Sequence, residues 1–198
     1  SAELGLDAAN LGLLTAVYFL VLAGAQIPIG VLLDRFGPRR VQSVLLVVAA
    51  GGASLFAAST GLLELLIARA MIGIGVAAAL MAGLKAIVTW FPRERVALIN
   101  GYMIMLGALG AVTATAPAEW LMGYSGWRGL FELSAAATLA AALLIFLAVP
   151  DKAQLVLPQR TSLKLGAIYR DPRFWRIAPL SASCIGSAWS LQGLWAAP

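Results

Sequence analysis

The stretch GVLLDRFGPRR, residues 30–40, separates two long apolar segments of this chain. Residues 8–33, which overlap its start, and residues 41–63, which follow it, carry no Asp, Glu, Lys or Arg. A transmembrane helix needs about 20 apolar residues to cross a hydrocarbon core of about 30 Å. Both segments are long enough, so the sequence predicts two membrane-spanning helices joined by a short charged loop.

The rest of the chain repeats this pattern. Hydrophobic residues make up 61% of the chain and charged residues 12%, and the mean hydropathy is +0.90, which leaves too little polar surface for a water-soluble globule. In lipid only helices and closed barrels satisfy their backbone hydrogen bonds, and these segments are about twice the length of barrel strands. We therefore predict an all-α, polytopic transmembrane helix bundle with about six spans, at residues 9–33, 41–60, 62–91, 97–122, 128–149 and 174–198.

The predicted helices fall into two groups. Residues 1–150 contain the first five, joined by short turns. Residues 151–173 contain Pro158 and Pro172 among several charges, which suits an interfacial linker before the last helix. We expect three parts: a helical domain at 1–150, a linker at 151–173 and the start of a second bundle at 174–198.

Lys and Arg residues gather on one predicted side of the membrane. Apart from Arg69, Lys85 and Arg128, all of them lie in residues 34–40, 91–96 and 151–176. Cytoplasmic loops carry an excess of Lys and Arg, so we predict that loops 34–40, 91–96 and 151–173 are cytoplasmic and that the protein lies in the inner membrane. The net charge of +5 is then a topology signal, and we expect no nucleic-acid partner.

Small residues recur within the predicted helices. Gly73, Gly75, Gly107 and Gly110 are expected to let helix backbones approach closely, which is how membrane helices gain packing energy. Cys184, the single cysteine, lies in an apolar run and is expected to be a packing residue. The pattern suggests neither a metal site nor a cofactor.

The spacing of Gly30, Asp34-Arg35, Gly37 and Arg39-Arg40 resembles the signature loop of the major facilitator superfamily, which links helices 2 and 3 of that family on the cytoplasmic side. Pro38 is an extra residue relative to the shortest form of the pattern. In the family this loop packs on the second half of the transporter, and its carboxylate helps to hold one access state. The resemblance implies this role for Asp34, with Arg35, Arg39 and Arg40 as its partners. An ordinary positive-inside loop is the alternative, although it explains only the arginines.

Two further stretches resemble the same family in the same order. Arg69-x-x-x-Gly73-x-Gly75 is similar to its helix 4 motif, and Gly126-Trp127-Arg128 followed by Phe131 is similar to its turn between helices 5 and 6. The resemblance implies that the chain corresponds to family helices 2 to 7, the N-terminal half without its first helix. The C-terminal half of the same transporter is then an expected partner.

The family's antiporter signature in helix 5 is a poor match. It expects Gly-Pro and then paired glycines, whereas this chain has Gly107, Gly110 and then Ala116-Pro117-Ala118. Uptake or symport is therefore favoured over exchange of drugs.

Two charges lie inside the third predicted helix, where a charge near the bilayer centre costs about 2.5 to 3.5 kcal/mol. Arg69 and Lys85 are about 160° apart around an ideal helix, so they do not line one cavity. The resemblance implies that Arg69 points toward the transport path. For Lys85 we expect snorkelling to the headgroups or an ion pair with a helix outside this chain.

Uncharged polar residues supply further candidates for the path. These are Tyr18, Gln26, Asn100, Ser190, Gln192 and Trp195. Polar residues in membrane helices also bond to neighbouring helices, so each has that alternative role. No acidic residue lies in the middle of a predicted helix, which favours an anionic or neutral solute over a cationic drug.

Together these features predict a secondary transporter that moves a small solute through the bilayer by alternating access. One alternative is a membrane sensor or scaffold with the same fold. An embedded enzyme fits less well, because the sequence shows no nucleophile with its base, no metal ligands and no paired carboxylates.

Overall fold

The computed structural model describes residues 7–150 together with residues 172, 175, 176, 179 and 183. The chain divides into two compact units, residues 1–153 and 154–198. The predicted linker at 151–173 and most of the predicted helix at 174–198 lie outside the described residues. Their assignment, and with it the proposed division into domains, stays a prediction.

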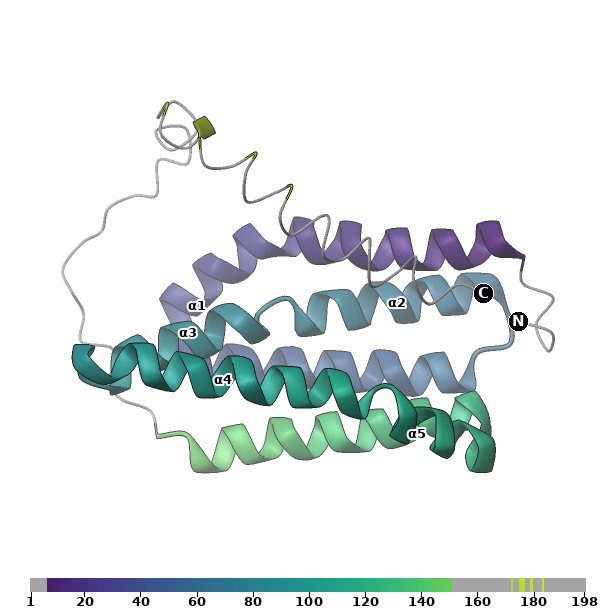
Figure 1. Ribbon diagram of the computed structural model, residues 1–198. Coiled ribbons are helices and arrows are strands. Elements are labelled where there is room, and N and C mark those ends of the chain that lie inside the picture. Colours follow the sequence, from purple (N-terminus) through teal and green to yellow (C-terminus); the bar gives the residue numbers. More distant parts are fainter. Residues whose placement is uncertain (1–6, 151–171, 173–174, 177–178, 180–182, 184–198) are drawn as a thin grey trace. The chain divides into compact units, whose positions relative to one another are not determined.

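The described part of the chain is built of helices and contains no strand, which confirms the all-α fold (Figure 1). The helices are α1 (Ala8–Ala58), α2 (Leu62–Val76), α3 (Ala79–Trp90), α4 (Arg93–Thr113) and α5 (Ala116–Ala148). The first begins where the carboxylate of Asp7 accepts a hydrogen bond from the backbone N–H of Asn10, at 2.8 Å. This side chain satisfies one of the backbone donors that every helix start leaves without a partner.

Two of the predicted spans are limbs of α1. Gly37 lies between them with φ 80° and ψ 162°, a conformation open to glycine and strained for other residues. Pro38 follows, where its fixed φ suits the first turn of a new helix. The prediction of a loop over 34–40 is therefore corrected: the residues on both sides of Gly37 are helical, and one residue makes the turn.

The third predicted span, residues 62–91, is divided into α2 and α3. Residues 77 and 78 form a turn between them, and both alanines are buried. The predicted span is confirmed as one apolar helical segment, Leu62–Trp90, and the turn within it, where both residues keep right-handed helical angles, was not predicted. Apolar periodicity could not reveal the break, because both halves have the same composition.

The boundary between α4 and α5 also differs from the prediction. The expected helix at 97–122 begins earlier, at Arg93, and ends at Thr113. Thr115 leaves the helical region, and α5 starts just before Pro117, which lacks an N–H and so fits the first turn of a helix. The turn expected at residues 125–126 is a kink within α5, where Gly126 has φ 68°.

Four helical segments of the described chain are long and apolar enough to cross a membrane: Ala9–Ala58, Leu62–Trp90, Arg93–Thr113 and Ala116–Ala148. The first contains both limbs of α1. Large apolar side chains face outward, and Leu20, Leu63 and Leu147 are each at least 70% exposed. Such a surface needs lipid around it, and the protein is an integral membrane protein.

Close packing is concentrated where α2 lies between the two limbs of α1 (Figure 1). A Cβ atom on Gly73 would lie 2.9 Å from the backbone oxygen of Tyr18, and one on Gly75 would lie 2.5 Å from the backbone nitrogen of Ala49. By contrast, α4 has no buried residue, and Gly107 and Gly110 have no atom within 4 Å of the Cβ position. The structure thus places one predicted glycine pair in a tight helix contact and leaves the other pair in open space.

Candidate functional site

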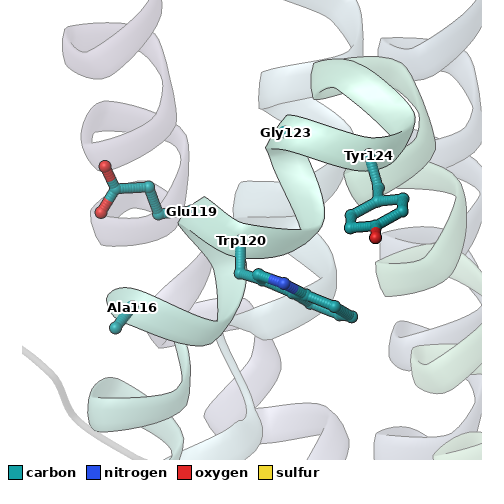
Figure 2. A pocket seen from close by; sticks show the side chains of 5 residues that line it. All are labelled: Ala116, Glu119, Trp120, Gly123 and Tyr124. Atoms are coloured by element: carbon teal, nitrogen blue, oxygen red, sulfur yellow. The ribbon is translucent and has the colours of Figure 1, made fainter.

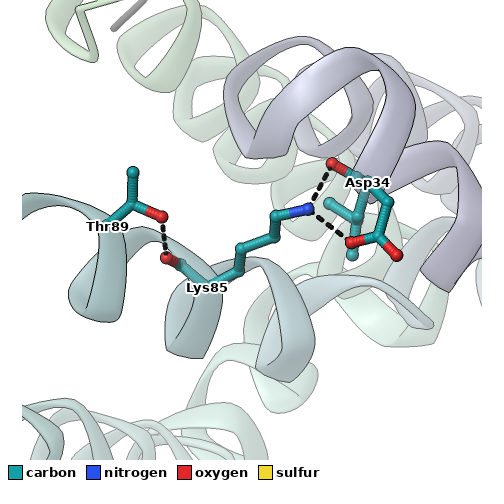
Figure 3. A network of polar contacts seen from close by, with 4 residues as sticks. Asp34, Lys85 and Thr89 are labelled. Carbon is teal, nitrogen blue, oxygen red and sulfur yellow. Dashed lines mark hydrogen bonds and ion pairs between the residues drawn. The ribbon is translucent and has the colours of Figure 1, made fainter. Parts of the chain in front are cut away.

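Charged side chains meet at one end of the helices, around residues 33–40 of α1 and 85–95 of α3 and α4, which we call the basic end. The Lys85 Nζ atom lies 2.6 Å from the Asp34 Oδ1 atom and donates a hydrogen bond to the Leu33 carbonyl oxygen at 2.8 Å (Figure 3). Lys85 therefore pairs within this chain. The expectation of snorkelling or of a partner on an outside helix is corrected.

The arginines of the same stretch have different surroundings. The Arg39 Nε atom donates to the Phe146 carbonyl oxygen at 2.8 Å, and the guanidinium lies 4.8 Å from the centre of the Phe146 ring. Arg39 thus ties the turn of α1 to the last residues of α5. Arg35 lies over its own neighbour, Phe36, at 5.2 Å. Arg40 is exposed, and no atom lies within 4 Å of a Cβ on Gly30.

At the other end of the same helices, aromatic rings gather into what we call the aromatic end: Phe56 of α1 with Trp127 and Phe131 of α5. The Phe56 ring centre lies 4.2 Å from that of Phe131 and 6.0 Å from that of Trp127. Leu65 and Ala68 of α2 pack in the same cluster and are 1% and 0% exposed. Three helices therefore meet in a water-poor environment.

Arg69 lies against this cluster. Its guanidinium carbon is 4.8 Å from the centre of the Phe56 ring and 5.8 Å from that of Phe131. Stacking on rings recovers part of the cost of burying the charge. The Nε atom of Arg69 is buried and has no hydrogen-bond partner within the described part of the chain. A buried N–H of a charged group without an acceptor is costly and rare, so this donor calls for an acceptor.

Arg128, the second arginine of the aromatic end, differs from Arg69 because its guanidinium has hydrogen-bond acceptors. It stacks on Trp127 at 4.4 Å, and its guanidinium donates to the carbonyl oxygens of Ala57 and Ser59 at 2.5 and 3.0 Å. These carbonyls belong to the last turn of α1, where no helical donor follows. Arg128 therefore closes the C-terminus of α1 and attaches α5 to it.

The predicted path residues are only partly brought together. Tyr18 packs through its backbone and ring against Gly73 and interacts electrostatically with Arg69. Gln26 and Asn100 make no hydrogen bond with Arg69 among the described residues, and the side-chain oxygen of Asn100 is buried without a partner there. Gln192, Trp195 and Ser190 lie outside the described residues.

A surface hollow lies elsewhere, on the first part of α5. It is lined by Ala116, Glu119, Trp120, Gly123 and Tyr124, all from one helical segment, as Figure 2 shows. None of the predicted site residues lines it. Within the described ranges, no group of three His, Cys, Asp or Glu residues lies close enough to hold a metal ion.

Sequence reasoning missed the contacts that define both ends. The Lys85–Asp34 pair had a usable signal, because both residues lie near turns that the charge pattern places on the same side of the membrane. The role of Phe56 had none, since one phenylalanine in an apolar helix looks like any other. Arg128 was assigned to a turn, and only the kink at Gly126 turns it toward the end of α1.

Comparison with known proteins adds the following. Residues 1–197 match the family model of the Major Facilitator Superfamily. A hexuronate transporter from Escherichia coli K12 is 28% identical over 98% of the chain and 49% of its own length. A probable L-galactonate transporter from the same organism is 33% identical over 65% of the chain and 28% of its own length. A nitrate/nitrite transporter from Picosynechococcus sp. is 35% identical over 50% of the chain and 18% of its own length. The chain thus spans about half or less of the length of these curated relatives.

Proposed function

The chain belongs to the major facilitator superfamily, and from this membership we propose that it is part of a secondary transporter that moves a small organic or inorganic anion by alternating access. The transporter lies in the cytoplasmic membrane, with the basic end on the cytoplasmic side. Uptake by symport is part of the proposal, because the antiporter signature of helix 5 is a poor match in this chain. The remaining helices, including a C-terminal half, supply the rest of the path.

The observation that carries this proposal is the buried donor of Arg69. Two aromatic rings offset part of the cost of the charge, yet its Nε N–H has no acceptor among the described residues. A carboxylate or nitrate group has planar oxygens that match a guanidinium in a bidentate geometry. A bound anion would satisfy the donor and neutralise the charge at the same time.

The printed names of the relatives point to the same solute class. Nitrate, nitrite, hexuronate and L-galactonate all carry a negative charge at neutral pH, and they differ widely in size and shape. What they share is the anionic group. We therefore assign Arg69 to this shared group, and we assign the rest of the solute to other residues of the path.

Helices α1, α2 and α5 place other groups around Arg69. Tyr18 brings a phenolic hydroxyl from the N-terminal limb of α1, and the rings of Phe56 and Phe131 exclude water on the other side. Water exclusion strengthens the attraction between a cation and an anion. This site is thus polar on the side of Tyr18 and apolar on the side of the aromatic end.

The test measures ligand-dependent thermal stabilisation of the purified full-length protein in detergent. The panel contains nitrate, glucuronate, the neutral sugar glucose and the cation tetraphenylphosphonium. An anion should raise the unfolding temperature through binding linkage. Arg69→Ala should lower the affinity for that anion by at least about tenfold, because a hydrogen bond to a charged group contributes about 1.5 to 3 kcal/mol.

Arg128→Ala is the matched control, since it also removes an arginine that stacks on a ring at the same end. It should keep the response to the anion. The proposal fails if no anion stabilises the protein, if the cation does so instead, or if Arg69→Ala and Arg128→Ala weaken binding equally. A flat response to every solute would favour a sensor or scaffold.

A further inference from the structure

We propose that Phe56 is a positioning residue for Arg69. Its ring fixes the plane of the guanidinium without using any N–H group, so the donors of Arg69 stay free for a planar anion. This inference rests on the proposed function and adds the reason why the donor of Arg69 is available. Phe56 acts on the affinity for the solute through Arg69 and does not touch the solute itself.

Phe56 is held rigidly in the last turn of α1. Ser59 donates two hydrogen bonds to the Phe56 carbonyl oxygen, one from its hydroxyl at 2.6 Å and one from its backbone N–H at 3.3 Å. The centre of the Phe56 ring lies 4.2 Å from that of Phe131 and 6.0 Å, edge to face, from that of Trp127. The residue is 7% exposed. Both its backbone and its ring are therefore fixed, and the ring offers a firm surface to a neighbouring side chain.

The guanidinium of Arg69 lies on this surface, with its carbon 4.8 Å from the centre of the Phe56 ring. A guanidinium is planar, and its five N–H donors point outward in that plane. The face of a ring attracts the cation, but a phenyl ring has no lone pair to accept these donors in the guanidinium plane. An aromatic ring is thus a neighbour that can hold an arginine and leave its hydrogen-bonding edge free.

Other arginines of the chain show what happens to donors that are not kept free. Arg39 and Arg128 also lie over rings, yet both donate to backbone carbonyl oxygens. At Arg69 the buried Nε atom has no acceptor among the described residues. A buried donor without an acceptor is costly and rare, so the contact with Phe56 holds the guanidinium in a position that its own donors do not stabilise.

Removal of the ring should release the guanidinium. Without this contact, the side chain of Arg69 can rotate among its conformers and donate to water or to a carbonyl oxygen. Binding of an anion would then have to order the side chain again, and ordering a long side chain costs affinity. The loss is limited by the strength of the contact, which for a cation–π pair shielded from water corresponds to about a five- to thirtyfold change in affinity.

The experiment titrates nitrate and glucuronate into the purified full-length protein in detergent and measures the midpoint of thermal stabilisation. For an anion that stabilises the unmodified protein, Phe56→Leu and Phe56→Met should each raise the midpoint about five- to thirtyfold. Phe56→Tyr keeps a ring and should restore most of the affinity. Trp127→Leu is the matched control, because it removes a ring of the same cluster that lies under Arg128. It should lower the unfolding temperature and leave the midpoint unchanged.

A double-mutant cycle separates positioning from a general loss of structure. Arg69→Lys replaces the planar group by an ammonium, which has no plane for a ring to fix. Phe56→Leu should therefore raise the midpoint far less in combination with Arg69→Lys than it does alone. A ring with a purely structural role would give the same factor in both backgrounds.

An unchanged midpoint in Phe56→Leu and Phe56→Met, an equal loss in Trp127→Leu, or the same factor in the Arg69→Lys background would overturn the inference. Loss of folded protein in both ring-free variants would overturn it as well, because the ring would then hold the fold. The proposed function would survive these results as long as Arg69→Ala loses the response to the anion. If the unmodified protein responds to no anion, or if Arg69→Ala responds as before, the proposed function itself is contradicted and the inference falls with it.

Discussion

The basic end and the aromatic end both stabilise cations, but they do so through different contacts. Each places cations among apolar helices, where a charge that is buried without a partner is costly. At the basic end, Lys85 has a carboxylate and a carbonyl, and Arg39 has a carbonyl. At the aromatic end, Arg128 has two carbonyls, whereas Arg69 has rings and a buried Nε without an acceptor in the described residues.

The difference teaches how to tell structural cations from functional ones in a membrane protein. A cation whose donors are satisfied by backbone carbonyls joins one helix to another, and its role is complete within the fold. A buried cation that stacks on rings but lacks an acceptor is stabilised only in part. The contacts therefore give Arg39 and Arg128 a structural role, and they support the proposed role of Arg69 in binding the solute.

The largest expected effect comes from Gly75, which connects both ends through the contact of α2 with α1. In Gly75→Ala the new Cβ would lie 2.5 Å from Ala49 and 2.6 Å from the Leu45 carbonyl oxygen, so the helices must separate. We expect a loss in stability of about 3 kcal/mol, the upper end of the usual range for overpacking because backbone atoms are among those contacted, seen as a lower unfolding temperature without solute. Gly107→Ala has open space and should match the unmodified protein. Equal unfolding temperatures for the two variants would contradict the tight contact.

Arg128→Ala should have the next largest effect and would sharpen the contrast with Arg69. It removes the donors to the carbonyls of Ala57 and Ser59, and Ser59 is 1% exposed. The free energy of unfolding should fall by about 1.5 to 3 kcal/mol, the value of a hydrogen bond from a charged group. Thermal unfolding without solute measures this, with Arg69→Ala in parallel. If Arg69→Ala lowers stability as much, the two arginines do not differ as the contacts indicate.

The smallest effect is expected for Arg39→Lys at the basic end. The change keeps the positive charge but loses the Nε hydrogen bond to Phe146 and the flat stacking on its ring. The ring is half exposed, so the loss should be about 0.5 to 1 kcal/mol. The same unfolding measurement detects it. If Arg39→Lys lowered stability as much as Arg128→Ala, the basic end would not be more exposed to water than the aromatic end, and the comparison would fail.

Particular elements show how far sequence reasoning reached. Charge-free runs predicted the helices, and Gly37 and Gly126 were correctly placed at turns, because glycine tolerates the positive φ that a sharp turn requires. The breaks at 77–78 and 114–115 were missed, because both lie in apolar sequence where composition does not change. The Arg69 motif was identified from the spacing between Arg69 and the two glycines. The contact of Arg69 with aromatic rings was not predicted.

The sequence by itself determined the class of the protein, its family and its membrane-spanning character, because these depend on the composition and spacing of residues along the chain. Its predicted orientation follows from the same charge pattern. The tertiary structure alone decided which cation meets which acceptor. Lys85 and Asp34 are far apart in sequence, as are Arg128 and Ala57, and they meet because α1 reverses at Gly37 and α5 bends at Gly126. Contacts between distant residues depend on such turns and on helix packing, which no local pattern of residues specifies.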